Sequence, residues 1–155
     1  MEAGPESGGE DEARPHTLIQ ASHALDGQEG CIAEARHFAA GFLAKARTEH
    51  AVDVSPRAVD FTQLVVSELV TNAAKYAPGP VLMDLRVVGG MVEIVVWDSD
   101  PTVPEARVTD PGRIGQHGLE IVERVASSLT VHREAVGKRI TATLPLTDAA
   151  PLSNA

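Results

Sequence analysis

Residues 55–98 read SPRAVDFTQLVVSELVTNAAKYAPGPVLMDLRVVGGMVEIVVWD, and this stretch of the 155-residue chain decides the fold. Ser55-Pro56 is a good helix start, because Ser can cap free N–H groups and Pro is tolerated in the first turn. The helix should run to about Tyr76, since the Ala-Pro-Gly-Pro that follows blocks its continuation. Two runs of strand character come next, and the Gly89-Gly90 pair between them predicts a tight hairpin.

Further elements are expected on both sides of this helix. They are a short strand near residues 17–20, an amphipathic helix over 28–47, the hairpin strands 81–88 and 91–97, a long loop over 99–116, a helix over 118–126, and a second hairpin of 129–133 with 139–146. Clustered hairpins and helices of this kind predict an α+β fold. The expected architecture is a two-layer α/β sandwich, in which helices cover one face of a mostly antiparallel mixed sheet.

Length and composition bound the organisation of the chain. We expect one folded domain over residues 17–146, after a disordered acidic extension at 1–16 and before a flexible tail at 147–155. The formal net charge of −9 opposes contact with a phosphate backbone, so direct nucleic-acid binding is not expected. No apolar run approaches the roughly 18 residues of a membrane span, and the single cysteine, Cys31, suits a reducing compartment. We therefore expect a cytoplasmic protein without membrane contact.

The helix that starts at Ser55-Pro56 carries an anomaly in its apolar stripe. At about 100° per residue, Glu68 and Asn72 fall on the same face as Phe61 and Val65. A carboxylate turned toward a core is costly unless a cation or a bound polar ligand pairs with it. The spacing of four residues lets both side chains address one point. The alternative is that Glu68 merely lies at the solvent margin of a helix that is apolar on two sides.

Asp98 ends the second strand of the first hairpin. It continues the period-two alternation of Val92, Ile94 and Val96, which directs its carboxylate to their side of the sheet. An acid there can accept a hydrogen bond from a buried amine. The alternative is an Asp that starts the turn of residues 98–101.

A glycine-rich segment, residues 112–119 (GRIGQHGL), runs straight into the following helix. Such a junction offers free N–H groups and the positive end of a helix to an anion such as a phosphate. The segment matches neither the P-loop nor the dinucleotide fingerprint. It is therefore a weak signal when taken alone.

Together, the three features resemble the boxes of a known ATP-binding superfamily. Residues 67–77 (SELVTNAAKYA) resemble the N box of the ATP-binding fold shared by DNA gyrase, MutL and histidine kinases, the GHKL superfamily. Residues 96–101 (VWDSDP) are similar to its first glycine box, and residues 115–122 (GQHGLEIV) to its second. The order matches, and the resemblance covers nearly all of residues 17–146. The greatest similarity is to stand-alone bacterial domains of the anti-sigma-factor serine-kinase type.

The resemblance implies a Bergerat-type ATP-binding fold and a role for each matching residue. Asn72 would be the Mg2+ ligand, because its amide oxygen is a hard donor. Glu68 would orient or deprotonate the attacking hydroxyl, and Asp98 would accept the adenine amino group of ATP. Lys75 would add positive charge near the phosphates. Loop contacts to the phosphates would come from Gly115, His117, Gly118 and Leu119.

The resemblance also has departures, which keep several functions open. Asp100 stands where the first glycine box usually has the glycine that lets backbone approach adenine. The leading hypothesis is a serine/threonine kinase that phosphorylates a partner protein, such as an anti-sigma-factor antagonist, and that also sequesters a sigma factor. A nucleotide-responsive binding module without turnover and a detached histidine-kinase catalytic domain are the alternatives. Related kinases often dimerise, so the resemblance allows for a homodimer.

Overall fold

The computed structural model describes residues 19–76, 79–98, 114–135 and 137–148. Eight elements lie in these ranges: β1 (Gln20–Leu25), α2 (Cys31–His50), α3 (Pro56–Tyr76), β2 (Val81–Val88), β3 (Met91–Asp98), α5 (Ile114–Val125), β4 (Ser128–Arg133) and β5 (Lys138–Pro145). The five strands form one sheet in the order β1-β2-β3-β5-β4, and all four strand pairings are antiparallel. The predicted α+β class is confirmed.

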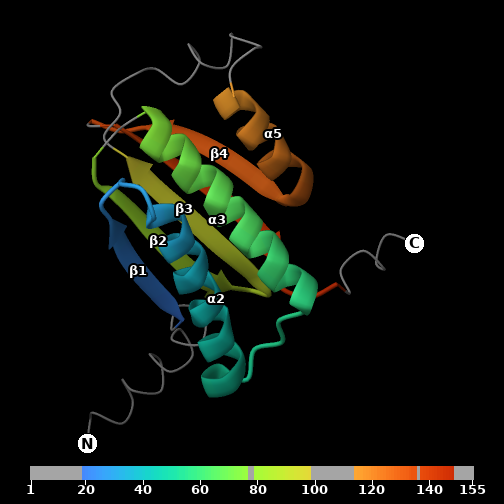
Figure 1. Cartoon of the computed structure of the whole chain (residues 1–155). Coiled ribbons are helices and arrows are strands. Elements are labelled where there is room, and N and C mark those ends of the chain that lie inside the picture. Colours follow the sequence, from blue (N-terminus) through green and yellow to red (C-terminus); the bar gives the residue numbers. More distant parts are fainter. Residues whose placement is uncertain (1–18, 77–78, 99–113, 136, 149–155) are drawn as a thin grey trace, which may run out of the picture.

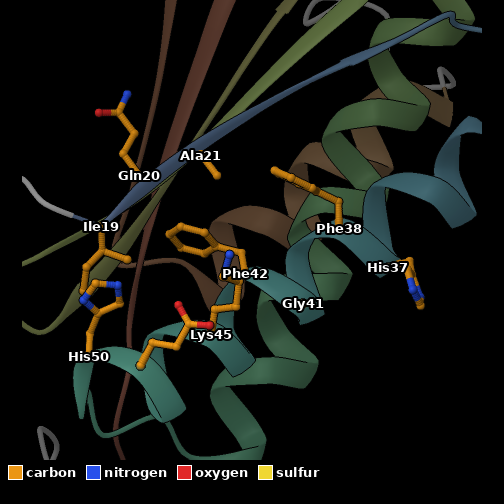
Figure 2. A pocket seen from close by; sticks show the side chains of 10 residues that line it. Ile19, Gln20, Ala21, His37, Phe38, Gly41, Phe42, Lys45 and His50 are labelled. Carbon is orange, nitrogen blue, oxygen red and sulfur yellow. The ribbon is translucent and has the colours of Figure 1, made fainter.

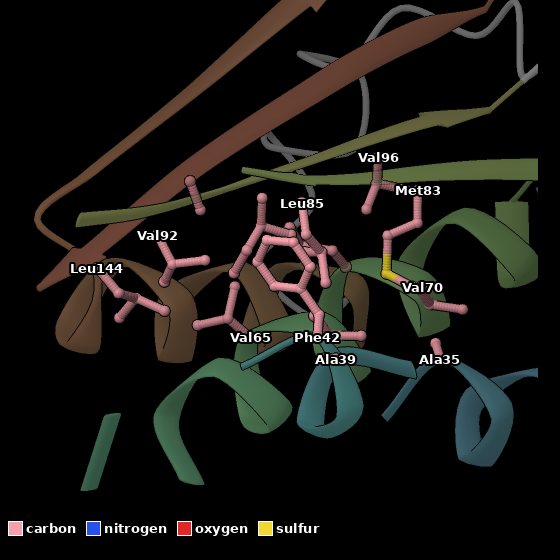
Figure 3. Packing of buried hydrophobic residues seen from close by; sticks show 14 of the residues in the cluster. Ala35, Ala39, Phe42, Val65, Val70, Met83, Leu85, Val92, Val96 and Leu144 are labelled. Carbon is pink, nitrogen blue, oxygen red and sulfur yellow. The ribbon is translucent and has the colours of Figure 1, made fainter. Parts of the chain in front are cut away.

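The helices lie together on one face of the sheet (Figure 1). Alternate residues of β2 point toward them and are buried, namely Val81, Met83, Leu85 and Val87, whereas Leu82 and Val88 on the opposite face are exposed. Figure 3 shows Met83 and Leu85 packed with Phe42 of α2 and Val65 and Val70 of α3. The core is therefore mostly aliphatic and lies between the sheet and the helices. The sheet's opposite face is not covered by any of the described helices.

Helix α3 and the β2–β3 hairpin have the bounds that local signals predict. The hairpin turn is Gly89-Gly90, with φ of 55° and 80°, a left-handed region that a two-residue turn of this type requires and that glycine enters freely. The second hairpin, β4–β5, is also confirmed. Among the described helices, none combines the length and apolar character that a bilayer crossing requires.

Two predicted boundaries were wrong. The first strand covers Gln20–Leu25 rather than residues near 17–20, because hydrogen bonds to a distant acid fix it rather than its own apolar pattern. Ser22 Oγ donates to Asp84 Oδ1 on β2 at 2.6 Å, and Gln20 Nε2 donates to the same atom at 3.1 Å. Helix α5 begins at Ile114 rather than Gly118, so part of the predicted glycine-rich loop is helical. The burial of Val122 against the core offsets the low helix propensity of the glycines.

Ser55 caps the N-terminus of α3 as predicted. Its Oγ accepts a hydrogen bond from the N–H of Ala58 at 3.0 Å and donates one to Asp148 Oδ1 at 3.1 Å. Its own N–H donates to the carbonyl of Leu146 at 2.8 Å, which ties the start of α3 to the end of β5.

We expect Ser55→Ala to lower the free energy of unfolding by about 1 kcal/mol, because the Ala58 N–H loses its acceptor while the backbone bond to Leu146 remains. Urea denaturation of the two proteins measures this difference. An unchanged midpoint would show that the cap contributes nothing to stability.

Candidate functional site

The ends of three elements lie together at one end of the sandwich (Figure 1). They are the C-terminus of α3, the end of β3 and the start of β5. The connection between α3 and β2 explains this, since α3 ends at Tyr76 and β2 begins at Val81. Leu82 of β2 pairs with Trp97 of β3, so the end of α3 is held near the end of β3. Asp98 of β3 pairs in turn with Lys138 of β5.

Asn72 lies one turn before the end of α3 and is buried, with 5% of its surface exposed. Its amide oxygen Oδ1 is fully enclosed and has no hydrogen-bond partner among the described residues. An unpaired buried amide oxygen costs about 1–3 kcal/mol relative to one that is bonded. Such an atom is suited to a partner that arrives with a ligand, and a hard cation is one that an amide oxygen prefers.

Glu68 precedes Asn72 by four residues on the same helix and is half-buried. Within the described ranges, its carboxylate forms no hydrogen bond or ion pair. The structure thus combines the two predictions for this residue: Glu68 is on the face that continues toward Asn72, but it retains access to solvent. A carboxylate in this position can reach a substrate and accept a proton from it.

Asp98 is buried on the helix-covered side of β3, as its alternation with Val92, Ile94 and Val96 predicts. Its Oδ2 is 2.7 Å from Nζ of Lys138, and the Lys and Asp side chains are only 3% and 1% exposed. The pair joins the end of β3 to the start of β5. The resemblance implies only a weak ligand contact from residues 137–139, which take the place of its last box, and does not identify Lys138 as the partner of Asp98. Lys138 nevertheless alternates with the buried Ile140, Ala142 and Leu144, which is the same signal that Asp98 carries.

The remaining predicted site residues have different placements. Lys75 is exposed in the last turn of α3. Leu119 packs its side chain against the core. Gly115, His117 and Gly118 belong to the first half of α5, and their exposure and the contacts of His117 lie outside the described part of the structure, as does all of Asp100.

A separate groove of about 520 Å³ lies between β1 and α2 (Figure 2). Ala21 of β1 and Phe38, Phe42, Lys45 and His50 of α2 line it, together with Ile19. None of the predicted site residues contributes to it. Among the described residues, no three His, Cys, Asp or Glu side chains gather as a metal site made of such groups would need.

One family model matches most of the chain, and two solved structures are similar to it. The family model described as "Histidine kinase-like ATPase domain" matches residues 28–144. The chain is similar to the histidine kinase domain of a blue-light activated histidine kinase from Erythrobacter litoralis EL346, with 25% identity and a TM-score of 0.46 over 61% of this chain and 47% of that one. It is also similar to Acinetobacter baumannii histidine kinase AdeS, with 13% identity and a TM-score of 0.49 over 83% of this chain and 68% of that one.

The chain spans about half the length of the first of these structures, 47% of it. No curated protein sequence matches the chain. The family match covers most of the chain and includes Glu68, Asn72, Asp98 and Lys138, which supports ATP binding. The chain belongs to the histidine kinase-like ATPase domain family.

Proposed function

We propose that the protein binds ATP through Mg2+ and transfers the γ-phosphate to a serine or threonine of a partner protein, in the manner of an anti-sigma-factor kinase. The observation that carries this proposal is the unpaired Oδ1 of Asn72, buried one turn from the half-buried carboxylate of Glu68. A fold that leaves both groups without partners among the described residues retains them at a cost to stability. Binding of a ligand can offset that cost.

Asn72 is suited to hold Mg2+, because its free amide oxygen is a hard donor and Mg2+ is usually held by one or two protein oxygens together with substrate phosphates. Bound there, the ion would neutralise charge on the phosphates. Lys75 would add a positive charge at the end of α3. Asp98 would accept a hydrogen bond from the adenine amino group. Further proposed nucleotide contacts are Asp100, Gly115, His117, Gly118 and Leu119.

Glu68 would serve as the general base. The hydroxyl oxygen of the partner's serine or threonine attacks the γ-phosphorus, and its proton passes to the Glu68 carboxylate. The bond between the γ-phosphorus and the bridging oxygen breaks, and ADP leaves with that oxygen. Access of Glu68 to solvent supports this role, since a protein substrate must reach the carboxylate from outside.

The proposed partner is an anti-sigma-factor antagonist, which would be phosphorylated, or a sigma factor, which would be bound. Acting on such proteins, the chain would regulate bacterial transcription from the cytoplasm, and a homodimer is compatible with this role. A binding module without turnover remains the second candidate. Asp100, which stands where the first glycine box usually has its glycine, is the feature that favours this candidate.

We expect Glu68→Gln to bind ATP within about threefold of the wild type but to transfer phosphate roughly 100- to 10,000-fold more slowly, because only the proton acceptor is lost. The assay uses ATP labelled at the γ-position, a bacterial cell extract as the source of partner, and identification of the labelled amino acid. Asp60→Asn is the matched control, as it makes the same change at an exposed site two turns earlier on α3.

Acid-stable label on serine or threonine that Glu68→Gln loses and Asp60→Asn retains would support the kinase. Acid-labile label on histidine would favour a histidine-kinase catalytic domain instead. ATP binding without any transfer would favour the binding module.

A further inference from the structure

We propose that Lys138 is a positioning residue for nucleobase recognition, which holds the carboxylate of Asp98 in place so that the site distinguishes a 6-amino purine from a 6-oxo purine. This inference rests on the proposed binding of ATP at the same site. It assigns the base specificity to a pair of residues, Asp98 and Lys138, rather than to one acid.

Lys138 and Asp98 form a short, buried hydrogen-bonded ion pair. Nζ of Lys138 and Oδ2 of Asp98 are 2.7 Å apart, the distance of a strong charge-assisted hydrogen bond. Both side chains point to the helix-covered face, because each continues a row of buried apolar residues along its strand. Val92, Val96 and Leu144 of those rows are in the core that Figure 3 shows.

A purely structural role explains this pair poorly. Removing two charges from water is costly, and well-packed apolar residues of similar volume often stabilise a protein as well or better. The pair is also not placed in the middle of the core, where it would join layers of the fold. It lies at the last position of β3 and the first of β5, the end of the sheet at which α3 presents Asn72. The two charged side chains therefore lie where the proposed ligand would bind.

The hydrogen-bonding groups of Asp98 and Lys138 determine which purine base the pair can recognise. An ionised carboxylate only accepts hydrogen bonds, so it favours the 6-amino group of adenine and repels the 6-oxo group of hypoxanthine or guanine. The ammonium of Lys138 compensates the charge in this dry site. Without it, Oδ2 of Asp98 loses the partner that fixes the orientation of the carboxylate, so the acceptor oxygens are no longer held toward the 6-amino group. Discrimination between the two bases would then disappear, although the phosphate contacts would remain.

The test compares ATP with inosine triphosphate, which has the same ribose and phosphates but a 6-oxo group. We expect the wild type to bind ATP about 10- to 100-fold more tightly than inosine triphosphate, the range for one hydrogen bond to a charged group. In Lys138→Met, which keeps the length of the side chain but not its charge, this ratio should fall below about threefold. Lys138→Arg, which keeps the charge, should retain most of it.

The outcomes separate this inference from the function on which it rests. A wild-type protein that binds neither nucleotide would refute the proposed function itself. A folded Lys138→Met protein that binds ATP and keeps the full preference would overturn the role of Lys138 alone.

A second measurement needs no variant and covers the case in which Lys138→Met does not fold. The Nζ resonance of Lys138 in 15N-labelled wild-type protein should move on addition of ATP by more than on addition of inosine triphosphate at saturation. Equal responses to the two nucleotides would contradict the inference.

Discussion

Replacing Asn72 with alanine should weaken Mg2+-dependent binding of ATP at least about 100-fold, because the variant lacks the amide oxygen proposed to bind the ion. The same change should not destabilise the free protein. The Oδ1 atom is buried without a partner among the described residues, so its removal relieves an unfavourable burial while a small cavity is left. We expect the free energy of unfolding without ligand to stay within about 1 kcal/mol of the wild-type value.

Thermal unfolding with and without ligand measures both effects. At a ligand concentration 100 times the Kd, binding stabilises a protein by about 2.7 kcal/mol, so wild-type protein should show a clear rise in Tm with Mg-ATP. Asn72→Ala should be stabilised by no more than about 0.4 kcal/mol at the same ligand concentration, so its Tm should hardly rise. Thr62→Val is the matched control, since Thr62 is on the same helix, is fully buried and also has an Oγ1 without a partner among the described residues.

Thr62 lies ten residues before Asn72, toward the other end of α3. Its substitution should therefore leave the response to Mg-ATP at the wild-type level while relieving a similar unpaired atom. An equal loss of the response in both variants would mean that helix α3 tolerates neither change and that Asn72 has no special role.

Gly27→Ala should be the most destabilising of the substitutions considered, lowering the free energy of unfolding by about 3 kcal/mol or more. Gly27 has φ of 75°, which strains any residue with a Cβ, and a Cβ there would overlap the backbone carbonyl oxygen of Gly79. That contact brings the β1–α2 connection against the connection that follows α3. Because backbone cannot move aside as a side chain can, the clash adds to the conformational strain.

Gly30→Ala is the control that separates the two contributions. Gly30 also has a positive φ, 96°, but a Cβ at this position meets nothing within 4 Å. Its substitution should cost only the conformational strain, about 1 kcal/mol. Urea denaturation of both variants gives the difference, and similar losses would show that close packing against Gly79 does not contribute.

Local signals explain which parts of the fold are predictable from the sequence. Ser55-Pro56 and the Pro-Gly segment after Tyr76 determine both ends of α3, and Gly89-Gly90 determines the first hairpin, so each bound follows from neighbouring residues. β1 has no such signal. Its pairing depends on Asp84, which is 62 residues from Ser22 in the sequence, and only the folded chain brings the two together.

Some residues of the candidate site are likewise predictable from local sequence patterns, and others are not. The helical spacing of Glu68 and Asn72 and the strand alternation of Asp98 are short-range patterns, and the structure places these side chains as the patterns predict. Lys138 is 40 residues from Asp98, and their contact depends on which strands become neighbours in the sheet. Alternation could have shown that Lys138 points inward. Its partner could not have been found without the register of β3 and β5.

The central claim is that this chain binds ATP through Mg2+ at the end of α3, and a calorimetric titration of the wild-type protein with ATP, with and without Mg2+, tests it most directly. The account predicts saturable binding at a micromolar Kd that requires Mg2+ and that Asn72→Ala removes. A folded wild-type protein that releases no heat of binding under either condition, and whose Tm does not respond to Mg-ATP, would contradict it. The fold would then have retained the buried Asp98–Lys138 pair, and an Asn72 Oδ1 that has no partner among the described residues, for contacts with proteins alone.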